Sequence, residues 1–289
     1  MLSLRPRPSA RPEAPQRNER RGGHRAYREV VVGGLRTACL SRQQLTSLMV
    51  GDCIAAHGGK RRPKLVFASN GHAIALAATD AQFRKYFEAA NLIHADGQPV
   101  VIASRLLTRS PIPERSATTD FIHDAARAAA ESGLSFFLLG ATERVNAQCA
   151  MALELQYGAL HIAGRRNGYF TPEEEGALCD AINASGADVL WVGLGVPLEY
   201  DFCVRNRHRL NAGWIVTCGG CFNFVTGEYA RAPDWMQRCS LEWLYRLLRE
   251  PRRLFWRYAI TNPLALFALL TKTASSPPPN AGPALSGAR

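Results

Sequence analysis

The chain has 289 residues, of which 47% are hydrophobic, so it is long enough to bury a sizeable core in one large domain, with or without an appendage. Its formal net charge is +11, and no apolar run reaches the ~18 residues that a membrane-spanning helix needs. The composition predicts a globular protein and excludes a chain that is disordered throughout.

The positive charge is spread unevenly. Residues 1–28 carry eight arginines against two glutamates, are rich in Pro, Ser and Gly, and contain almost no large apolar side chains. We therefore expect residues 1–29 to form a disordered basic tail, and residues 274–289, which are also rich in Pro, Ser and Gly, to form a second disordered tail. We expect no secretory signal, because the first residues offer no apolar core of useful length.

Between the tails, short apolar runs alternate with segments of helical periodicity. After a first short strand at Val30–Val32, the predicted strands are residues 64–68, 92–96, 135–140, 188–195 and 214–220. The predicted helices are residues 41–57, 73–90 and 143–157, and another begins at Thr171, where Thr would be the cap and Pro172 the first helical residue. Glycine at the strand ends and this alternation predict an α/β fold over residues 30–229, a parallel Rossmann-like sheet with helices on both faces.

From residue 230 the pattern is helical only, which predicts a C-terminal appendage over residues 230–273. Ser240 can cap a helix whose apolar residues recur at helical spacing, and Pro251 would end or kink that helix before a second one. Seven arginines lie among tryptophan and tyrosine rings in residues 228–258. This combination suits a phosphate-bearing partner or an anionic membrane surface, and an ordinary amphipathic helix with a solvated basic face is an equally good interpretation.

Asp96 ends a predicted strand, at the edge of the sheet where ligands bind in such folds. A carboxylate there could act as a general base toward a hydroxyl nucleophile. An Asp that precedes a Gly more often bonds its own backbone in a turn, so both interpretations stay open. Arg115 follows at a distance that suits one intervening helix, and a surface salt bridge is its simplest interpretation.

Two glycine motifs raise other functions. Gly193-Leu-Gly195 matches only half of the dinucleotide-binding fingerprint, because the third glycine is absent, so a redox nucleotide is disfavoured. A glycine turn whose backbone lies close to a bound diphosphate remains open. Cys218-Gly-Gly-Cys221 has redox-motif spacing, but two thiols beside a tight turn are the simpler interpretation. A metal site at these two cysteines would need two more ligands at a plausible spacing, and His208 is the single candidate, so we expect no metal and no cofactor. The eight cysteines lie mostly in apolar segments, which indicates reduced thiols in a cytosolic compartment.

Ten further blocks occur in a consistent order along the chain. They are Ser69-Asn70, His94–Gly97, Pro113–Arg115 with Asp120, Phe137–Gly140, Asn167–Phe170, Val192–Pro197, Gly219-Gly220 with Phe222, Arg231–Trp235, Leu241–Leu247, and Glu250–Arg252 with Arg257-Tyr258. Taken together, these blocks resemble the WecG/TagA/CpsF glycosyltransferase family over roughly residues 30–270.

The resemblance implies a hexosyltransferase that moves a sugar from a UDP-sugar to a polyprenyl-diphosphate-linked saccharide, with inversion and without a divalent metal. It places the enzyme peripherally on the cytoplasmic face of the cell membrane, in the biosynthesis of a cell-surface polysaccharide or exopolysaccharide. The α/β domain would carry the active site, and the helical appendage would complete it and dock to an anionic membrane surface. Nucleic acid is not an expected partner, and a homo-oligomer is left open.

Under this resemblance Asp96 would be the catalytic base and Arg115 would stabilise the diphosphate. The substrate-binding candidates come from strand ends, glycine turns and the appendage: Ser69, Asn70, Gly97, Gly195, Pro197, Glu199, Gly219, Gly220, Arg246, Arg252, Arg253 and Arg257. Three positions depart from the family's pattern, with Ala68 where Thr is usual, Thr118 where Gly is frequent, and Glu199 where Gln is usual. A carboxylate at 199 accepts a hydrogen bond but does not donate one as an amide does.

The alternative from another class is a non-catalytic basic protein that binds a membrane or nucleic acid. Against it, the charge is concentrated in the N-terminal tail and in the appendage. A thiol oxidoreductase that uses Cys218 and Cys221 is a third hypothesis.

Overall fold

A computed structural model describes residues 27–59 and 62–275; residues 1–26 and 276–289, which hold most of the two predicted tails, lie outside the described residues. The strands are β1 Glu29–Val32, β2 Leu35–Ala38, β3 Lys64–Ser69, β4 Leu92–Ala95, β5 Ser135–Gly140, β6 His161–Arg166, β7 Val189–Gly193 and β8 Trp214–Thr217. The helices are α1 Arg42–His57, α2 Gly71–Thr79, α3 Ala81–Ala89, α4 Gln98–Leu107, α5 Thr118–Ser132, α6 Glu143–Gln156, α7 Glu175–Ser185, α8 Leu198–Asn206, α9 Cys221–Val225, α10 Asp234–Arg238, α11 Glu242–Arg249 and α12 Pro251–Thr271.

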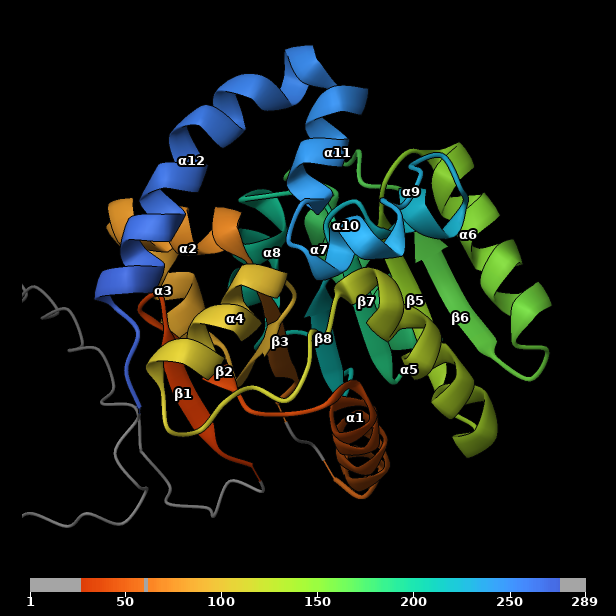
Figure 1. The fold of residues 1–289 in the computed structure, drawn as a ribbon. Coiled ribbons are helices and arrows are strands. Elements are labelled where there is room, and N and C mark those ends of the chain that lie inside the picture. The colour runs from red at the N-terminus through yellow and green to blue at the C-terminus, as the bar shows by residue number, and fades with distance from the viewer. Residues whose placement is uncertain (1–26, 60–61, 276–289) are drawn as a thin grey trace, which may run out of the picture.

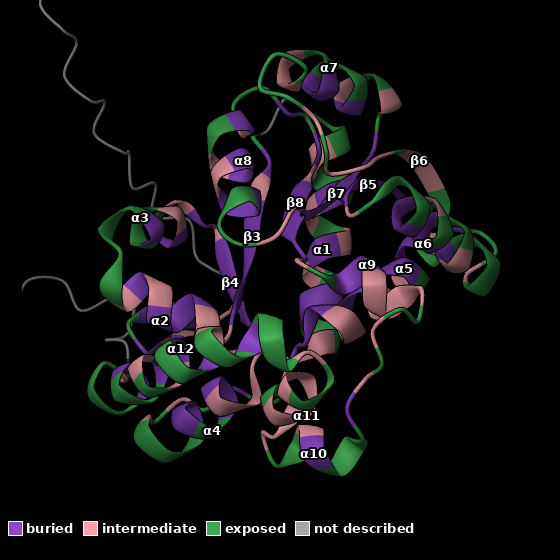
Figure 2. Cartoon of the chain, turned by 90° about the horizontal axis from the view of Figure 1, so that it is seen from above, coloured by how far each residue is buried: buried purple, intermediate pink, exposed green. Residues whose placement is uncertain are grey.

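Within the described residues, β3 to β8 form a parallel six-stranded sheet in the order β4-β3-β8-β7-β5-β6 (Figure 1). Helices α1, α5 and α6 pack on one face, and α2, α3, α7 and α8 pack on the other. Because both faces are covered, a central strand such as β7 is buried at every position, as the view from above also shows (Figure 2). The predicted Rossmann-like α/β fold is confirmed.

The first and last described segments lie against each other. Strands β1 and β2 form an antiparallel hairpin separate from the main sheet. The Val31 N–H donates to the carbonyl oxygen of Ala274 at 3.1 Å, and the Ala274 N–H donates back at 2.9 Å. Ala274, predicted to belong to the second disordered tail, is therefore held by backbone hydrogen bonds.

Helices α10, α11 and α12 lie above the carboxyl ends of the strands (Figure 1). Pro251 is the first residue of α12, in agreement with the predicted break between two helices. Ala265 and Ala268 of α12 are buried, and the methyl group of Ala265 lies 3.7 Å from the position of a Cβ added at Gly71 in α2. None of the helices in the described residues has the length and apolar character needed to cross a membrane.

Residues 73–90 form two helices rather than the single helix predicted. Asp80 has an extended backbone, and its Oδ1 accepts the N–H groups of Gln82 at 2.8 Å and Phe83 at 3.1 Å. Asp80 thus caps a new helix, α3, because an N-cap residue must leave helical geometry.

Two predicted helix caps are also wrong. Thr171 begins a turn, closed by the Glu174 N–H on its carbonyl oxygen at 3.1 Å, and α7 begins at Glu175. Ser240 has φ +61° and ends α10 instead of starting α11. The Leu241 N–H donates to the carbonyl oxygen of Met236 at 2.7 Å, and the Ser240 N–H donates to that of Gln237 at 3.2 Å. This is a Schellman motif, in which a residue of positive φ satisfies the last helical carbonyls.

Candidate active site

Asp96 lies just beyond β4, and its carboxylate is held by neighbouring donors. Asn70 Nδ2 donates to Oδ2 at 3.0 Å, while Thr118 donates to Oδ1 through its N–H at 2.7 Å and its Oγ1 at 3.2 Å. Asn70 follows β3, which pairs with β4, and Thr118 begins α5. Because the three residues come from three separate elements, the fold itself orients this carboxylate.

Gly97 allows the ends of β3 and β4 to approach each other. A Cβ at this position would lie 3.2 Å from Asn70 Cα and 3.3 Å from Asn70 Cβ, closer than nearly all side chains come. The N–H groups of Asp96 and Gly97 both donate to the carbonyl oxygen of Ser69, at 2.9 and 3.1 Å. A side chain at 97 would therefore push Asn70 away from the Asp96 carboxylate.

The surroundings of Asp96 favour its ionised form. Burial alone would raise the pKa of the carboxyl, but the charges of Arg115 and His94 and the hydrogen bonds from Thr118 and Asn70 outweigh burial and hold the pKa below its usual value. A carboxylate has about four positions for accepting hydrogen bonds, of which the bonds described use three. One acceptor position on Oδ2 remains without a hydrogen bond from the described residues.

Arg115 connects this carboxylate to the appendage. Its Nε donates to the backbone oxygen of Asp96 at 2.6 Å, and its Nη2 forms an ion pair with Glu242 Oε2 at 2.7 Å. Glu242 is in the first turn of α11. The pair is largely shielded from solvent, so the position of α11 depends on the same guanidinium that supports Asp96.

Glu199 occupies the neighbouring part of the sheet edge. It lies in the first turn of α8, is 3% exposed, and its Oε2 accepts the N–H groups of Gly195 at 3.2 Å and Gly219 at 2.9 Å. Burial raises the pKa of Glu199 to about 8. The two N–H hydrogen bonds act to lower this pKa, and the negative charge of Asp96 acts to raise it. The Glu199 carboxyl is therefore mostly protonated at neutral pH, and the two glycine N–H groups already have a partner.

Two arginines of the appendage lie against the segment that follows β8. The guanidinium carbon of Arg246 is 5.5 Å from the ring centroid of Phe224, and that of Arg253 is 5.7 Å from the ring centroid of Tyr229. The Tyr229 ring would in turn contact a Cβ at Gly220, at 3.5 Å. These stacked guanidinium groups therefore come close to the glycine turn after β8.

Arg257 lies on the other side of the appendage, near α2. Its guanidinium carbon is 4.9 Å from the ring centroid of Tyr258. Burial, assisted by the charge of Arg257, lowers the pKa of His72 to about 4, and His72 is in the first turn of α2 beside Asn70. Arg252 is exposed and has no ion pair or hydrogen bond within the described residues.

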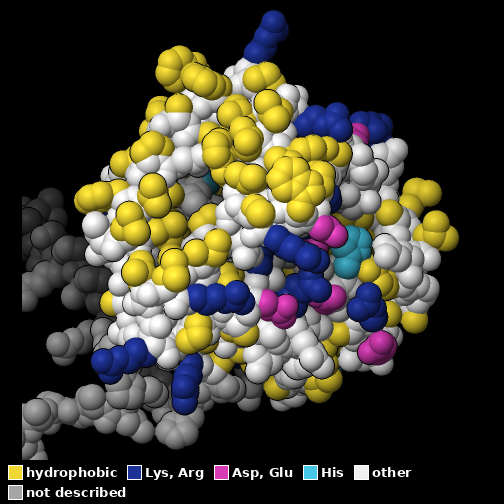
Figure 3. Space-filling model, in the orientation of Figure 1, with side chains coloured by type: hydrophobic (Ala, Val, Ile, Leu, Met, Phe, Trp, Pro, Cys, Tyr) yellow, Lys and Arg dark blue, Asp and Glu magenta, His cyan; other side chains and the backbone are white. Residues whose placement is uncertain are grey.

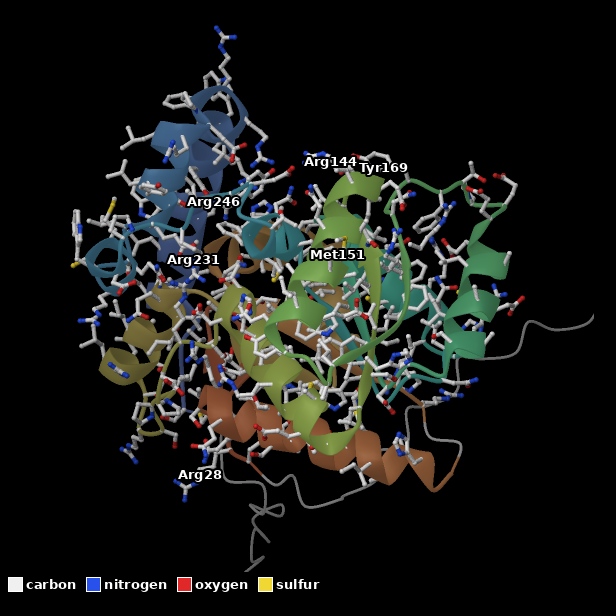
Figure 4. The ribbon with its side chains drawn as sticks, turned by 90° about the vertical axis from the view of Figure 1, so that its right-hand side faces the viewer. Arg28, Arg144, Met151, Tyr169, Arg231 and Arg246 are labelled. Carbon is white, nitrogen blue, oxygen red and sulfur yellow. The ribbon has the colours of Figure 1, made fainter. Side chains whose placement is uncertain are left out.

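The arginines at the two ends of the described chain lie far apart. Figure 4 shows Arg231 and Arg246 on the C-terminal segments, with Arg28 at the opposite end of the molecule.

Arg231 is held by Asp120, whose Oδ1 accepts from its Nη1 at 2.7 Å, and by Gln237 Oε1, which accepts from Nη2 at 2.7 Å. Arg231 thus joins α10 to α5.

The Cys218 and Cys221 thiols do not favour redox chemistry. Burial raises the pKa of the Cys218 and Cys221 thiols well above the usual range, so neither forms a thiolate readily, as a redox cysteine must. No group of three or more His, Cys, Asp or Glu side chains that could hold a metal ion comes together in the described residues.

A family model described as "Glycosyl transferase WecG/TagA/CpsF family" matches residues 30–277, most of the chain. The chain belongs to this family. The match begins within β1 and extends past α12, so one family model covers the sheet together with all three C-terminal helices.

In this WecG/TagA/CpsF glycosyltransferase, the predicted substrate-binding residues fall into three places. Ser69, Asn70 and Gly97 lie with Asp96 at the ends of β3 and β4; Gly195, Pro197, Glu199, Gly219 and Gly220 lie after β7 and β8; and Arg246, Arg252, Arg253 and Arg257 lie in α11 and α12. Since β8 is the neighbour of β3, the first two groups share one edge of the sheet. Ser69 differs from the rest, because it is fully buried and its hydroxyl has no hydrogen-bond partner in the described part of the chain.

Two residues of the site were not predicted from the sequence. The sequence marks Thr118 only as a departure from the family's pattern, whereas in the structure Thr118 supplies two of the three hydrogen bonds to the Asp96 carboxylate. Glu242 was one letter in a family block, and its ion pair with Arg115 joins the appendage to the α/β domain. The sequence could have predicted that Glu242 lies in the first turn of a helix, because acidic residues are favoured there, but it gave no indication of the ion pair with Arg115.

Proposed function

We propose that this glycosyltransferase is an inverting, metal-independent hexosyltransferase that moves a sugar from a UDP-sugar to a polyprenyl-diphosphate-linked acceptor. It works at the cytoplasmic face of the cell membrane, in the synthesis of a cell-surface polysaccharide or exopolysaccharide. The observation that carries the proposal is an oriented, ionised Asp96 at the carboxyl edge of a parallel sheet, beneath an arginine-rich appendage.

In the proposed reaction, Asp96 acts as general base through the free position on Oδ2. It takes the proton of the acceptor hydroxyl as that oxygen forms a bond to the anomeric carbon of the donor sugar, and the bond from that carbon to the diphosphate of UDP breaks. Attack from the side opposite the departing UDP inverts the anomeric centre. The carboxylate would be protonated after transfer and would return its proton to water.

The diphosphate that leaves carries negative charge, and guanidinium groups can stabilise it without a metal. Arg115 is held in place by Asp96 and Glu242, and its remaining N–H groups make no hydrogen bond within the described residues. Arg246 and Arg253, stacked near the Gly219-Gly220 turn, are candidates to bind phosphate groups of the donor, and Arg252 and Arg257 those of the donor or the lipid acceptor. Arginine forks match phosphate oxygens with two parallel hydrogen bonds.

The appendage also has a surface that suits a membrane. Large hydrophobic side chains gather over α11 and α12 at the top of the molecule (Figure 3). Among them, Trp256 is 71% exposed and Leu248 is 72% exposed, and Phe255, Ile260 and Phe267 are also exposed. Aromatic and aliphatic side chains beside arginines are typical of helices that lie in the interface of an anionic bilayer. We infer that this surface brings the site to its lipid-linked acceptor.

The proposal is tested by measuring UDP release from a panel of UDP-sugars with a polyprenyl-diphosphate-linked saccharide and EDTA. Release that requires both donor and acceptor is expected, and the productive donor identifies the sugar. The Asp96→Asn variant is the matched control, because an amide keeps the shape and lacks the base. A folded protein that releases no UDP and binds no UDP-sugar would instead favour a non-catalytic basic protein.

A further inference from the structure

Glu199 is a buried acid without a cationic partner. Among the described residues no Lys, Arg or His forms an ion pair with it. Its Oε2 is used twice, by the N–H groups of Gly195 and Gly219, whereas Oε1 has no hydrogen-bond partner in the part of the chain that the structure describes. Only 3% of Glu199 is exposed, so Oε1 has little access to water, and a polar atom so placed is costly unless it finds another partner.

The first turn of α8 is held rigidly, so Oε1 cannot turn elsewhere at low cost. Tyr200, the next residue, is buried, with its ring centroid 5.0 Å from that of Phe67 and 5.1 Å from that of Phe83. These contacts fix α8 against the sheet and against α3. The two glycine N–H groups then fix the carboxyl itself.

The groups that face Glu199 are acidic or neutral. The charge of Asp96 acts on Glu199 and raises its pKa, and Glu199 in turn acts on three other titratable groups, the Tyr200 hydroxyl and the Cys203 and Cys218 thiols. Burial raises the pKa of these three groups well above their usual ranges, so they are neutral. An ionised Glu199 would therefore add a negative charge without a cationic partner to a site that already holds the Asp96 carboxylate.

We propose that Glu199 is a neutral acid that donates a hydrogen bond from Oε1 to a diphosphate oxygen of the bound UDP-sugar, and so replaces an amide at this position. The identity of the ligand rests on the proposed function. Oε2 anchors the carboxyl on the two glycine turns, and Oε1 carries the proton toward the ligand. Loss of that proton removes the donor and places an anion against the diphosphate, which makes donor binding depend on pH.

The protonation state is measured directly by infrared difference spectroscopy of the folded protein. A carbonyl band of a protonated carboxyl group is expected at pH 7, is expected to fade as the pH rises to 9, and should be absent from Glu199→Gln. Glu154→Gln, which changes an exposed acid, is the matched control and should keep the band. If the wild-type protein has no such band at pH 7, the inference is overturned, and this reading needs no variant to fold.

The ligand is tested by calorimetric binding of UDP at pH 7 and pH 9. With a pKa of about 8, the neutral fraction falls about tenfold across this range, so wild-type affinity should fall about tenfold while that of Glu199→Gln stays nearly level. An equal fall in both proteins, or no binding of UDP by the wild type, overturns the donor role. If UDP binds as expected but no UDP-sugar is turned over, the proposed function fails and the inference on Glu199 stands.

Discussion

Replacing Glu199 by Gln should stabilise the folded protein, by an amount that grows with pH. The Glu199 carboxyl has an ordinary pKa of 4.5, and burial raises it to about 8 in the folded protein. The unfolded chain therefore ionises at a lower pH than the folded chain does. The contribution of Glu199 to the free energy of unfolding is therefore largest below pH 4.5. This contribution falls as the pH rises toward 8 and changes little above pH 8.

The size of the effect follows from the same two values. Each pH unit between them costs about 1.4 kcal/mol, so at pH 7 the wild-type protein should have lost about 3 kcal/mol through Glu199. A Gln side chain carries no charge and can still accept the N–H groups of Gly195 and Gly219 through its amide oxygen. About 3 kcal/mol is a large share of the 5–15 kcal/mol by which typical domains are stable.

The assay is urea denaturation of wild type, Glu199→Gln and the exposed control Glu154→Gln at pH 5, 7 and 8.5. The difference in unfolding free energy between Glu199→Gln and wild type should widen from pH 5 to pH 8, and the control should follow the wild type throughout. A difference that is the same at every pH would refute the reasoning, because it would mean that Glu199 ionises alike in the folded and unfolded chains.

Three further predictions concern the base, its support and the membrane surface. Asp96→Asn should lower single-turnover UDP release by about 10²–10⁴-fold with an unchanged circular dichroism spectrum, and wild-type turnover would remove Asp96 as base. Arg115→Lys keeps the charge but lacks the Nε–H that donates to the Asp96 carbonyl oxygen. This variant should therefore turn over substrate more slowly, and proteases should cut it faster between residues 230 and 275. Resistance to proteolysis equal to that of the wild type would show that α11 is held by other contacts. Trp256→Ser should weaken binding to anionic vesicles by at least about tenfold, since burying an aromatic side chain contributes about 1.5–3 kcal/mol. Equal vesicle binding by this variant would place the membrane contact elsewhere.

The sheet could be predicted from the sequence because its strands are buried on both faces. Such strands appear as continuous apolar runs that end in Gly, Asn or Asp, as at residues 135–140 and 188–195. Asp96 could be located for the same reason, since it directly follows an apolar run. The hairpin strand β2 and helix α5 were missed, because β2 has only four residues and the start of α5 has no side-chain cap to mark it.

Caps that depend on tertiary position were the least predictable feature. Serine is a residue type that is common at N-caps, but Ser240 adopts a positive φ and ends α10 instead. Nothing local distinguishes the two roles, because each depends on which carbonyl groups need a partner. The same holds for Thr118, whose N–H and hydroxyl reach Asp96 only because β4 ends beside the start of α5.

Glu199 shows how burial changes the chemistry that a residue type implies. From the sequence, an acid in place of an amide meant a group that accepts hydrogen bonds and cannot donate them, and that conclusion assumed an ionised carboxylate. In the folded chain the side chain is buried, feels the charge of Asp96 and forms no ion pair among the described residues, so the neutral form prevails at pH 7. A neutral carboxyl has one acceptor oxygen and one O–H donor, which is the pattern that an amide presents to its two sides. On the proposal made for Glu199, the acid would keep the hydrogen bonding of an amide below pH 8 and add a dependence on pH that an amide lacks.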